Sequence, residues 1–360
     1  MQSPSKDKTA VWVITPNGVA IAQRIAKHLP SADIYTSNKI ETAAHNASAF
    51  GKLSDAVAER FHFYKAHIFI MATGIVVRVI APFIQNKFED PAVVVVDDQG
   101  RHAISLLAGH LGGANNLTRK IAGMIHADAV ITTATDVNEK PAIDVLAKEK
   151  KLVIENPAAV KTVNMALLTD QEIGLHDPFD VLKDDIPNVF MLNAEDVSNT
   201  GDAKTNRLFK NRAAAIYVDD KQIDLPANVL VLRPASLVAG IGCNRNTPME
   251  EIKTVLAKTL KKYQLAGSSV GRLATIEIKA DEPGLVELSN TLKVPLDFFN
   301  RKELCQAEDI QTPSAMVEKH VGVKSVCEAA AILASQMGTL IVPKQTTPNV
   351  TVAIARKAYI

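Results

Sequence analysis

The sequence predicts an α/β protein: an N-terminal, mostly parallel sheet flanked by helices, then a small middle α/β domain and a C-terminal α/β domain. Short apolar runs alternate with segments of helical spacing, which is the pattern of strand–helix–strand units. The run from Ala92 to Val96 is β-branched almost throughout, as expected for a strand buried on both faces. Polar and glycine-rich clusters follow several of the apolar runs, as they do in α/β proteins that bind ligands.

In the N-terminal domain, predicted at residues 1–138, the two periodicities alternate along the chain. Strands are predicted at 11–15, 32–36, 67–71, 92–96, 102–106 and 129–133, and helices at 19–29, 53–63, 75–84 and 117–125. Polar or glycine-rich clusters come directly after four of these strands, at 15–18, 73–74, 109–116 and 132–136. Because the carboxyl ends of parallel strands meet at one edge of a sheet, we expect the four clusters to share that edge and to line a binding cleft.

The middle domain, predicted at 139–228, begins with helices at 141–150 and 157–168 and a short strand at 152–154. Few clear periodicities follow, and the segment shows no catalytic constellation. His176 is interpreted as a loop residue.

The C-terminal domain is predicted at 229–360, and its first feature after two strands is a glycine turn that leads into a helix. Thr247, Pro248 and Glu250 have the spacing of a capping box at the start of that helix, which runs to about residue 263. Strands are predicted at 229–232, 237–241, 274–278, 295–299, 339–342 and 350–355, and further helices at 283–292, 301–305, 315–320 and 329–336.

The composition of the chain argues against several classes of protein. The chain of 360 residues has a formal net charge of +1, which argues against a surface dedicated to nucleic acid. It has no run of about 18 apolar residues, which argues against a membrane span, and its polar N-terminus is not followed by an apolar signal core, so a cytoplasmic protein is expected. The three widely spaced cysteines predict reduced thiols. Because neither CxxC nor HExxH occurs, no protein metal site is expected.

The stretch from Gly109 to Asn116 carries the clearest chemical signal of the chain. An apolar run delivers His110 into a glycine-rich bend, and a helical pattern begins directly afterwards. A strand, a glycine turn and a helix start together form a common anion site, because the glycines allow close backbone approach and the helix offers free N–H groups. His110 could also move a proton near neutral pH. The alternative is a plain turn with a capping role.

Eight stretches spread over nearly the whole chain resemble the cobalt-precorrin 5A hydrolase family of the anaerobic, cobalt-first cobalamin pathway. They are MATGIVVR at 71–78, DPAVVVVD at 90–97, 105–115, ITTATD at 131–136, GIGCNR at 240–245, 279–285, 322–330 and VPK at 342–344. The resemblance implies that the protein opens the δ-lactone on ring A of cobalt-precorrin 5A and releases the C20 fragment as acetaldehyde, giving cobalt-precorrin 5B. It also implies a cobalt tetrapyrrole substrate and no cofactor of the protein's own, because the cobalt arrives with the substrate.

That reaction would need a base to activate water, donors for the developing oxyanion, and a base for the freed C20 hydroxyl. His110 is the candidate base, with Glu328 as the competing base and Asp136 as a weaker one. The amides of the glycine turn, Gly112, Gly113 and Ala114, are candidate donors.

A substrate that carries many carboxylates would also need cations and helix N-termini around it. Asn115 is expected to orient water or substrate. The candidate substrate-binding residues are Thr73, Gly74, Arg78, Gly112, Gly113, Asn115, Gly242, Arg245, Lys279 and Lys344.

Two other functions stay open at this point. A non-catalytic tetrapyrrole carrier of the same pathway would bind the macrocycle without turnover. A nucleotide-binding α/β protein is disfavoured because the chain has neither a Walker A pattern nor a complete GxGxxG. A homodimer and contacts with other enzymes of the corrin pathway are open possibilities for partners, whereas nucleic acid and membrane are not expected.

Overall fold

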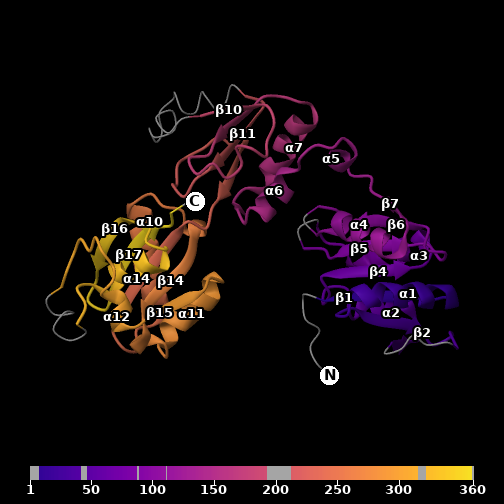
Figure 1. Cartoon of the computed structure of the whole chain (residues 1–360), viewed down its shortest axis with the longest axis horizontal. Helices are drawn as coiled ribbons and strands as arrows, with labels where there is room; N and C mark the ends of the chain where they lie inside the picture. Colours follow the sequence, from indigo (N-terminus) through magenta and orange to yellow (C-terminus); the bar gives the residue numbers. More distant parts are fainter. Residues whose placement is uncertain are drawn as a thin grey trace. The chain divides into compact units, whose positions relative to one another are not determined.

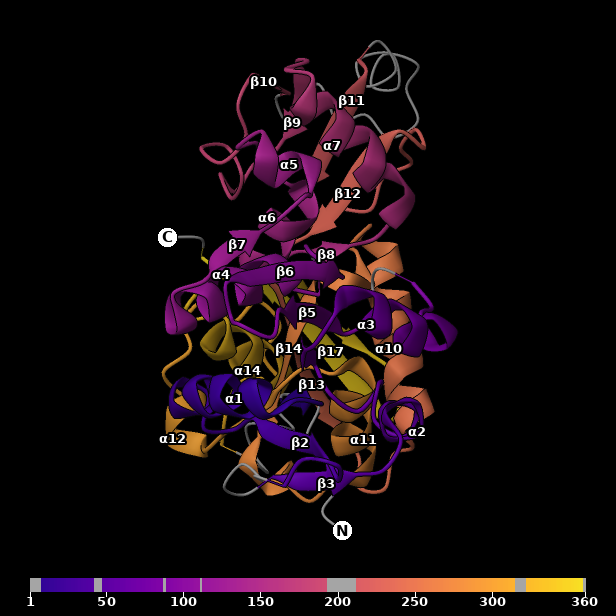
Figure 2. The same cartoon turned by 90° about the vertical axis from the view of Figure 1, so that its right-hand side faces the viewer.

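The computed structural model describes residues 8–41, 47–86, 89–110, 112–192, 212–314 and 322–358, and the helix predicted at 315–320 lies outside these ranges. The chain forms three sheets in succession (Figures 1 and 2), and it divides into two compact units, Met1–Val145 and Leu146–Ile360. The predicted α/β class is confirmed, because helices flank the sheets and parallel strand pairs dominate the first two, whereas the third sheet has two parallel and two antiparallel pairs. No helix among the described residues is long and apolar enough to cross a membrane.

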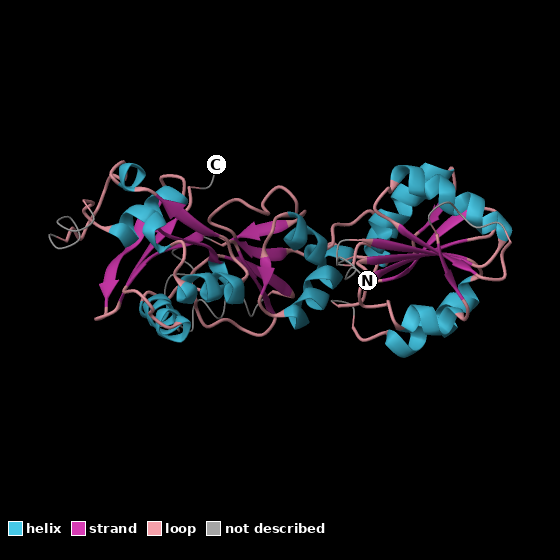
Figure 3. Cartoon of the chain, turned by 90° about the horizontal axis from the view of Figure 1, so that it is seen from below, coloured by secondary structure: helices cyan, strands magenta, loops and turns pink. Residues whose placement is uncertain are grey.

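The N-terminal sheet has the strand order β3-β2-β1-β4-β5-β6-β7. Its strands are β1 Thr9–Val13, β2 Asp33–Ser37, β3 Ser48–Phe50, β4 Ala66–Ile70, β5 Ala92–Val96, β6 His102–Leu107 and β7 Asp128–Val130. Helices α1 Pro16–His28 and α4 Ala114–Ile125 pack on one face, and α2 Leu53–Ala58 and α3 Thr73–Ile80, followed by η1 Ala81–Phe83, pack on the other. Figure 3 shows the sheet between these two layers of helices.

The carboxyl ends of the strands in this sheet lie at two different edges, because one strand pair is antiparallel. β5 and β6 pair antiparallel, with Val96 opposite Ala103 and Val93 opposite Leu107, so the carboxyl end of β6 lies beside the amino end of β5. The clusters after β1 and β4 therefore lie at one edge, and those after β6 and β7 lie at the other. The prediction that all four clusters share one edge is wrong. The connection at 97–101 is too short for a parallel crossover, which needs a dozen or more residues.

The middle sheet has the strand order β10-β9-β11-β12-β8, with only β8 antiparallel to its neighbour. Its strands are β8 Val153–Ile154, β9 Ile173–His176, β10 Val189–Met191, β11 Ala214–Val218 and β12 Val229–Arg233. Helices α5 Ala134–Val137 and α6 Ile143–Glu149 lead into it from β7, and η2 Pro157–Ala159 and α7 Val160–Leu168 connect β8 to β9.

Two sequence predictions for this region differ from the structure. The sequence predicts β12 as the first strand of the C-terminal domain, but its pairing with β11 and β8 assigns it to the middle sheet. His176 is the last residue of β9, so its interpretation as a loop residue is wrong.

The C-terminal sheet has the strand order β15-β14-β13-β17-β16, in which only β17 runs against the others. Its strands are β13 Leu237–Cys243, β14 Val270–Ile276, β15 Leu296–Phe299, β16 Thr339–Thr346 and β17 Val350–Arg356. Its helices are α10 Met249–Lys262, α11 Pro283–Leu292, α12 Arg301–Leu304 and α14 Val326–Ala334, with η3 Gly267–Ser269 and η4 Glu277–Lys279. α10 and α11 cover one face and α14 covers the other.

Two local features show how helices meet this sheet. α14 lies so close to β13 that a Cβ on Gly240 would stand 1.8 Å from the carbonyl oxygen of Cys327, so only glycine fits there. At α10, the predicted capping box does not form. Pro248 is the N-cap residue, and Thr247 Oγ1 instead donates to the carbonyl of Asn244 at 2.9 Å.

Candidate functional site

His110 is placed by the glycine turn between β6 and α4. Ala108 and Gly113 both adopt positive φ, 56° and 90°. A Cβ on Gly112 would stand 2.3 Å from the Cβ of Ala108, so the turn can close only over a glycine. The turn leaves the His110 side chain 18% exposed.

The imidazole of His110 lies between two carboxylates. Its Nε2 is 3.1 Å from Oδ2 of Asp136 and 2.9 Å from Oγ1 of Thr135, both on α5. Its Nδ1 is 3.8 Å from Oδ2 of Asp144, a buried residue in the first turn of α6. Because 3.8 Å exceeds a hydrogen-bond distance, we assign the ring proton to Nε2 and the lone pair to Nδ1.

Asp136 is held as an anion by three donors. Arg119 donates to its Oδ1 at 2.5 Å, and Asn115 Nδ2 donates to its Oδ2 at 2.8 Å. Partial burial acts to raise the pKa of Asp136, but the hydrogen bonds from Arg119, His110 and Asn115 outweigh it and hold the pKa below its usual range. A permanent carboxylate therefore faces Nε2 of His110.

Asn115 has a different role from the one predicted. It is buried, its Oδ1 accepts from Ser105 Oγ at 2.6 Å, and its Nδ2 donates to Thr133 as well as to Asp136. Both ends of its amide are thus engaged by protein groups. Asn115 orients Asp136, and through it His110, rather than water or substrate.

Two of the predicted oxyanion donors are also engaged. The Gly113 amide donates to the carbonyl of His110 at 2.9 Å, and the Ala114 amide donates to the carbonyl of Ala108 at 3.1 Å. These bonds close the turn, so the expectation that both amides face a ligand is wrong for this conformation. For Gly112, the role of donor stays a prediction.

Thr73, Gly74 and Arg78 do not lie near His110. They belong to α3, at the sheet edge where β1 and β4 end, and His110 lies at the opposite edge. Arg78 is exposed, and its Nη1 donates to the carbonyl of Gly74 one turn back at 3.2 Å. The prediction of one site containing all of these residues is therefore wrong.

The C-terminal candidates gather at the edge where β13, β14 and β16 end. Gly242 and Arg245 lie at and after the end of β13, Lys279 closes the 3₁₀ turn after β14, and Lys344 lies in the second half of β16. We refer to Arg245, Lys279 and Lys344 together as the cationic edge. Lys279 is buried, and its Nζ is 3.2 Å from Oε2 of the fully buried Glu282.

The other two cations of the cationic edge also have protein partners. Arg245 binds Asp281 at 2.5 Å and the carbonyl of Ile278 at 2.7 Å, whereas Lys344 Nζ donates to the carbonyl of Thr312 at 2.7 Å. The Arg245–Asp281 pair is exposed, so a ligand carboxylate could exchange with Asp281 at little cost.

Glu328 has the surroundings of a structural carboxylate. Its side chain is fully buried, its Oε2 accepts from the amides of Gln311 and Thr312 at 3.0 Å each, and its Oε1 accepts from Thr312 Oγ1 at 2.5 Å and from the Lys344 amide at 2.8 Å. It ties the start of α14 to a loop and to β16. This geometry argues against Glu328 as the competing base.

Replacing Glu328 with glutamine is expected to lower the free energy of unfolding by about 1–3 kcal/mol, because a carboxamide oxygen cannot replace both carboxylate oxygens as acceptors. Turnover per folded molecule should stay at the wild-type level. Urea unfolding together with activity at matched folded concentration measures both. A loss of turnover without a loss of stability would restore Glu328 as a base.

Replacing Asp136 with asparagine is expected to lower the free energy of unfolding by about 1.5–3 kcal/mol near neutral pH. The folded-state pKa lies below the unfolded value of about 3.9. The contribution of Asp136 is therefore fully present above that value and is lost as the pH falls through the folded-state pKa. The difference between wild type and variant should shrink below about pH 4. Urea unfolding followed by Trp12 fluorescence measures it, with Asp128→Asn, at an exposed position of β7, as control.

Sequence analysis did not assign three of the residues that surround the His110–Asp136 pair. Thr135 lies in the polar cluster predicted at 132–136, but its contact with His110 was not predicted. For Asp144 and Arg119, which also contact the His110–Asp136 pair, nothing in the local pattern indicates the contact. In the middle sheet, His176 Nε2 is 3.1 Å from Oδ2 of Asp219, and its ring stacks on Tyr217 at 4.9 Å. Among the described residues no group of three or more metal-ligating side chains could hold a metal ion.

Fold and site together define an α/β protein with three consecutive sheets and a histidine–carboxylate site suited to proton transfer. Three family models match consecutive parts of the chain: "Cobalamin synthesis G N-terminal" at 55–136, "Cobalamin biosynthesis central region" at 141–234 and "Cobalamin synthesis G C-terminus" at 237–355. The chain belongs to the cobalt-precorrin-5A hydrolase family, which confirms the resemblance seen in the sequence.

Its relatives include the cobalt-precorrin-5A hydrolase of Salmonella typhimurium, which is 38% identical over 341 residues that cover 93% of this chain and 94% of the relative. The hydrolase of the same name from Priestia megaterium is 35% identical over 362 residues, which cover 97% and 95%. A crystal structure of a putative cobalamin biosynthesis protein G homolog from Sulfolobus solfataricus is 21% identical, covers 99% of each chain and superposes with a TM-score of 0.36.

Proposed function

We propose that this chain is the hydrolase that opens the ring A δ-lactone of cobalt-precorrin 5A and releases acetaldehyde, giving cobalt-precorrin 5B. Relatives with that hydrolase name, similar over nearly the full length, support the substrate. The observation that carries the chemistry is the His110 imidazole, with Asp136 at Nε2 and Asp144 beside Nδ1.

In the first step, Nδ1 of His110 takes a proton from water as the water oxygen attacks the lactone carbonyl. Asp136 accepts the Nε2–H and fixes the tautomer that leaves the lone pair on Nδ1. Asp144, 3.8 Å from Nδ1, stabilises the imidazolium that forms. The lactone C–O bond then breaks as the imidazolium of His110 returns its proton to the leaving oxygen. This gives a free hydroxyl on the two-carbon arm and a carboxylic acid, which ionises to a carboxylate.

In the second step, the hydroxyl loses its proton and forms the carbonyl of acetaldehyde while the carbon–carbon bond to the macrocycle breaks. The electron pair of that bond passes to the macrocycle, which then takes up a proton. The metal in this step belongs to the substrate, and we propose no cofactor held by the protein. Arg245, with its exposed ion pair, is the proposed partner for a peripheral carboxylate of the substrate.

The decisive experiment incubates purified protein with cobalt-precorrin 5A and measures acetaldehyde through an alcohol dehydrogenase coupled to NADH oxidation. One equivalent of acetaldehyde per substrate, with opening of the lactone detected by mass spectrometry, is expected. Saturable binding of the substrate without acetaldehyde would instead identify a tetrapyrrole carrier.

A further inference from the structure

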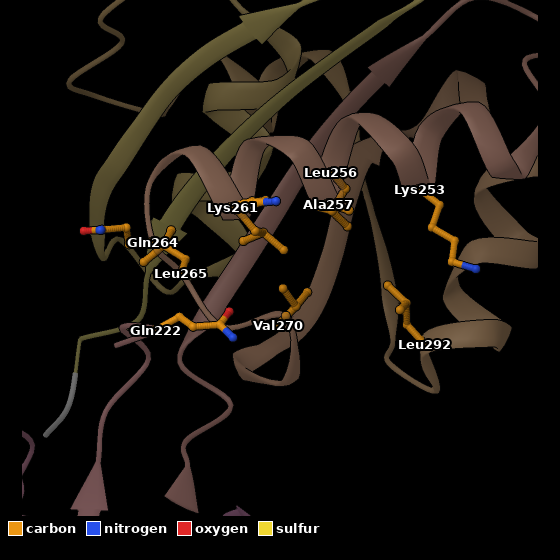
Figure 4. A pocket seen from close by; sticks show the side chains of 11 residues that line it. Gln222, Lys253, Leu256, Ala257, Lys261, Gln264, Leu265, Val270 and Leu292 are labelled. Carbon is orange, nitrogen blue, oxygen red and sulfur yellow. The ribbon is translucent and has the colours of Figure 1, made fainter. Parts of the chain in front are cut away.

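A pocket of about 570 Å³ lies along one side of α10, away from the residues discussed above. Figure 4 shows Gln222 and Val270 facing this side of the helix, with Lys253 and Leu292 at one end and Gln264 at the other. The volume and the combination of an apolar lining with a few polar groups are those of small-molecule sites. The apolar lining residues are Leu256, Ala257, Leu260, Leu265, Val270 and Leu292.

Backbone pairing holds one wall of this pocket in place. The amide of Gln222, from the segment that follows β11, donates to the carbonyl of Gln264 at 2.7 Å, and Lys221 and Leu265 form a β-bridge. The amide of Ala266 donates to the carbonyl of Asp220 at 2.8 Å. The wall is therefore preformed, and a ligand would not have to order it.

The polar groups of the pocket favour an anion. Lys253 and Lys261 are eight residues apart on α10, which corresponds to about 12 Å along the helix. Lys253 has only a weak surface pair with Glu250 at 3.6 Å, and none of the lining residues is acidic. The side chains of Gln222 and Gln264 add amide donors beside the two ammonium groups.

We propose that this pocket binds an amphipathic organic anion, with its apolar body against the leucines and its acidic group on Lys253 or Lys261. The site does not depend on the proposed hydrolase reaction. Val270 begins β14 and Lys279 follows its carboxyl end, so the pocket and the cationic edge lie at opposite ends of a strand of about 23 Å. A ligand in the pocket leaves that edge free.

The test uses two fluorescent probes that share one ring system. 8-Anilino-1-naphthalenesulfonate carries an acidic group, and N-phenyl-1-naphthylamine lacks it. Titration of the full chain should give one saturable site for each probe. In Ala257→Trp, where an exposed helix position receives a bulky side chain that fills the pocket, binding of both probes should be lost.

The double variant Lys253→Met/Lys261→Met separates charge from burial, because methionine keeps the apolar stem. It should weaken the sulfonate about three- to tenfold and leave the neutral probe unchanged. Lys258→Met, on the same helix but outside the pocket, is the matched control and should bind both probes like wild type. Unchanged binding in Ala257→Trp overturns the site. Equal effects of the double variant on both probes overturn the preference for an anion.

Discussion

Replacing His110 with alanine is expected to lower acetaldehyde release by about 10²–10⁴-fold, while the affinity for cobalt-precorrin 5A stays close to that of wild type. The side chain is held by Asp136, Thr135 and Asp144, not by any group that the substrate would need for binding. Removing it therefore takes away the proton acceptor and leaves the cationic edge of the C-terminal sheet intact. Stopped-assay acetaldehyde and equilibrium binding of the substrate measure the two quantities separately.

The matched control is His102→Ala. His102 begins β6, is exposed, and contacts Asp97 in the β5–β6 turn, so it shares the strand with the His110 turn but lies at the other edge of the sheet. Its variant should retain full turnover. Asp144→Asn should give an intermediate loss, because it removes the charge beside Nδ1 and keeps the ring. Normal turnover in His110→Ala would show that another group takes the proton.

Replacing Asp220 with alanine is expected to lower the free energy of unfolding by about 3–5 kcal/mol. This carboxylate is fully buried and follows β11 in the middle sheet. It accepts two hydrogen bonds from Arg356 on β17, at 2.7 Å each, and one from Ser236 Oγ at 2.7 Å. Truncation removes the buried carboxylate that accepts two hydrogen bonds from Arg356, and it removes a tie between the middle and C-terminal sheets.

The single tryptophan makes this effect easy to localise. Trp12 lies in the core of the N-terminal sheet, so its fluorescence reports the unfolding of that sheet, whereas far-UV circular dichroism reports the whole chain. In Asp220→Ala the circular dichroism transition should move to lower urea, and the Trp12 transition should stay in place. Asp184→Ala, at an exposed aspartate of the middle segment, is the control. Equal shifts in both signals would contradict an effect confined to the unit Leu146–Ile360.

The candidate site shows where sequence reasoning succeeds and where it stops. His110 and Asp136 stand out from the turns that carry them, and the structure places them 3.1 Å apart. The sequence does not identify Asp144 as a site residue, because it lies in a helix with an ordinary periodicity. Only the folded chain brings its carboxylate close to Nδ1 of His110. Glu328 is a candidate base because it is an ionisable group in the first turn of a helix. The four donors that bind its carboxylate come from segments distant in the sequence, and local patterns do not reveal them.

The question of which turns share a sheet edge shows the same limit of sequence-based prediction for the fold. The alternation of strands and helices is local, and the sequence predicts it correctly for most of the chain. The direction of β6 depends on how it pairs with β5, and that pairing decides whether Thr73 and His110 share an edge. The short connection at 97–101 contains this information, because it cannot span a parallel crossover.

By itself, the sequence determined the α/β class, the family and the positions of the chemically active turns, because periodicity, glycine spacing and motif order are properties of the chain taken in order. Only the tertiary structure decided which turns face one another, which carboxylates flank His110 and which predicted ligands are occupied by the protein's own groups. Those outcomes depend on strand direction and on contacts between distant residues, such as Asp220 with Arg356, 136 positions apart. Such contacts form only when the sheets are assembled.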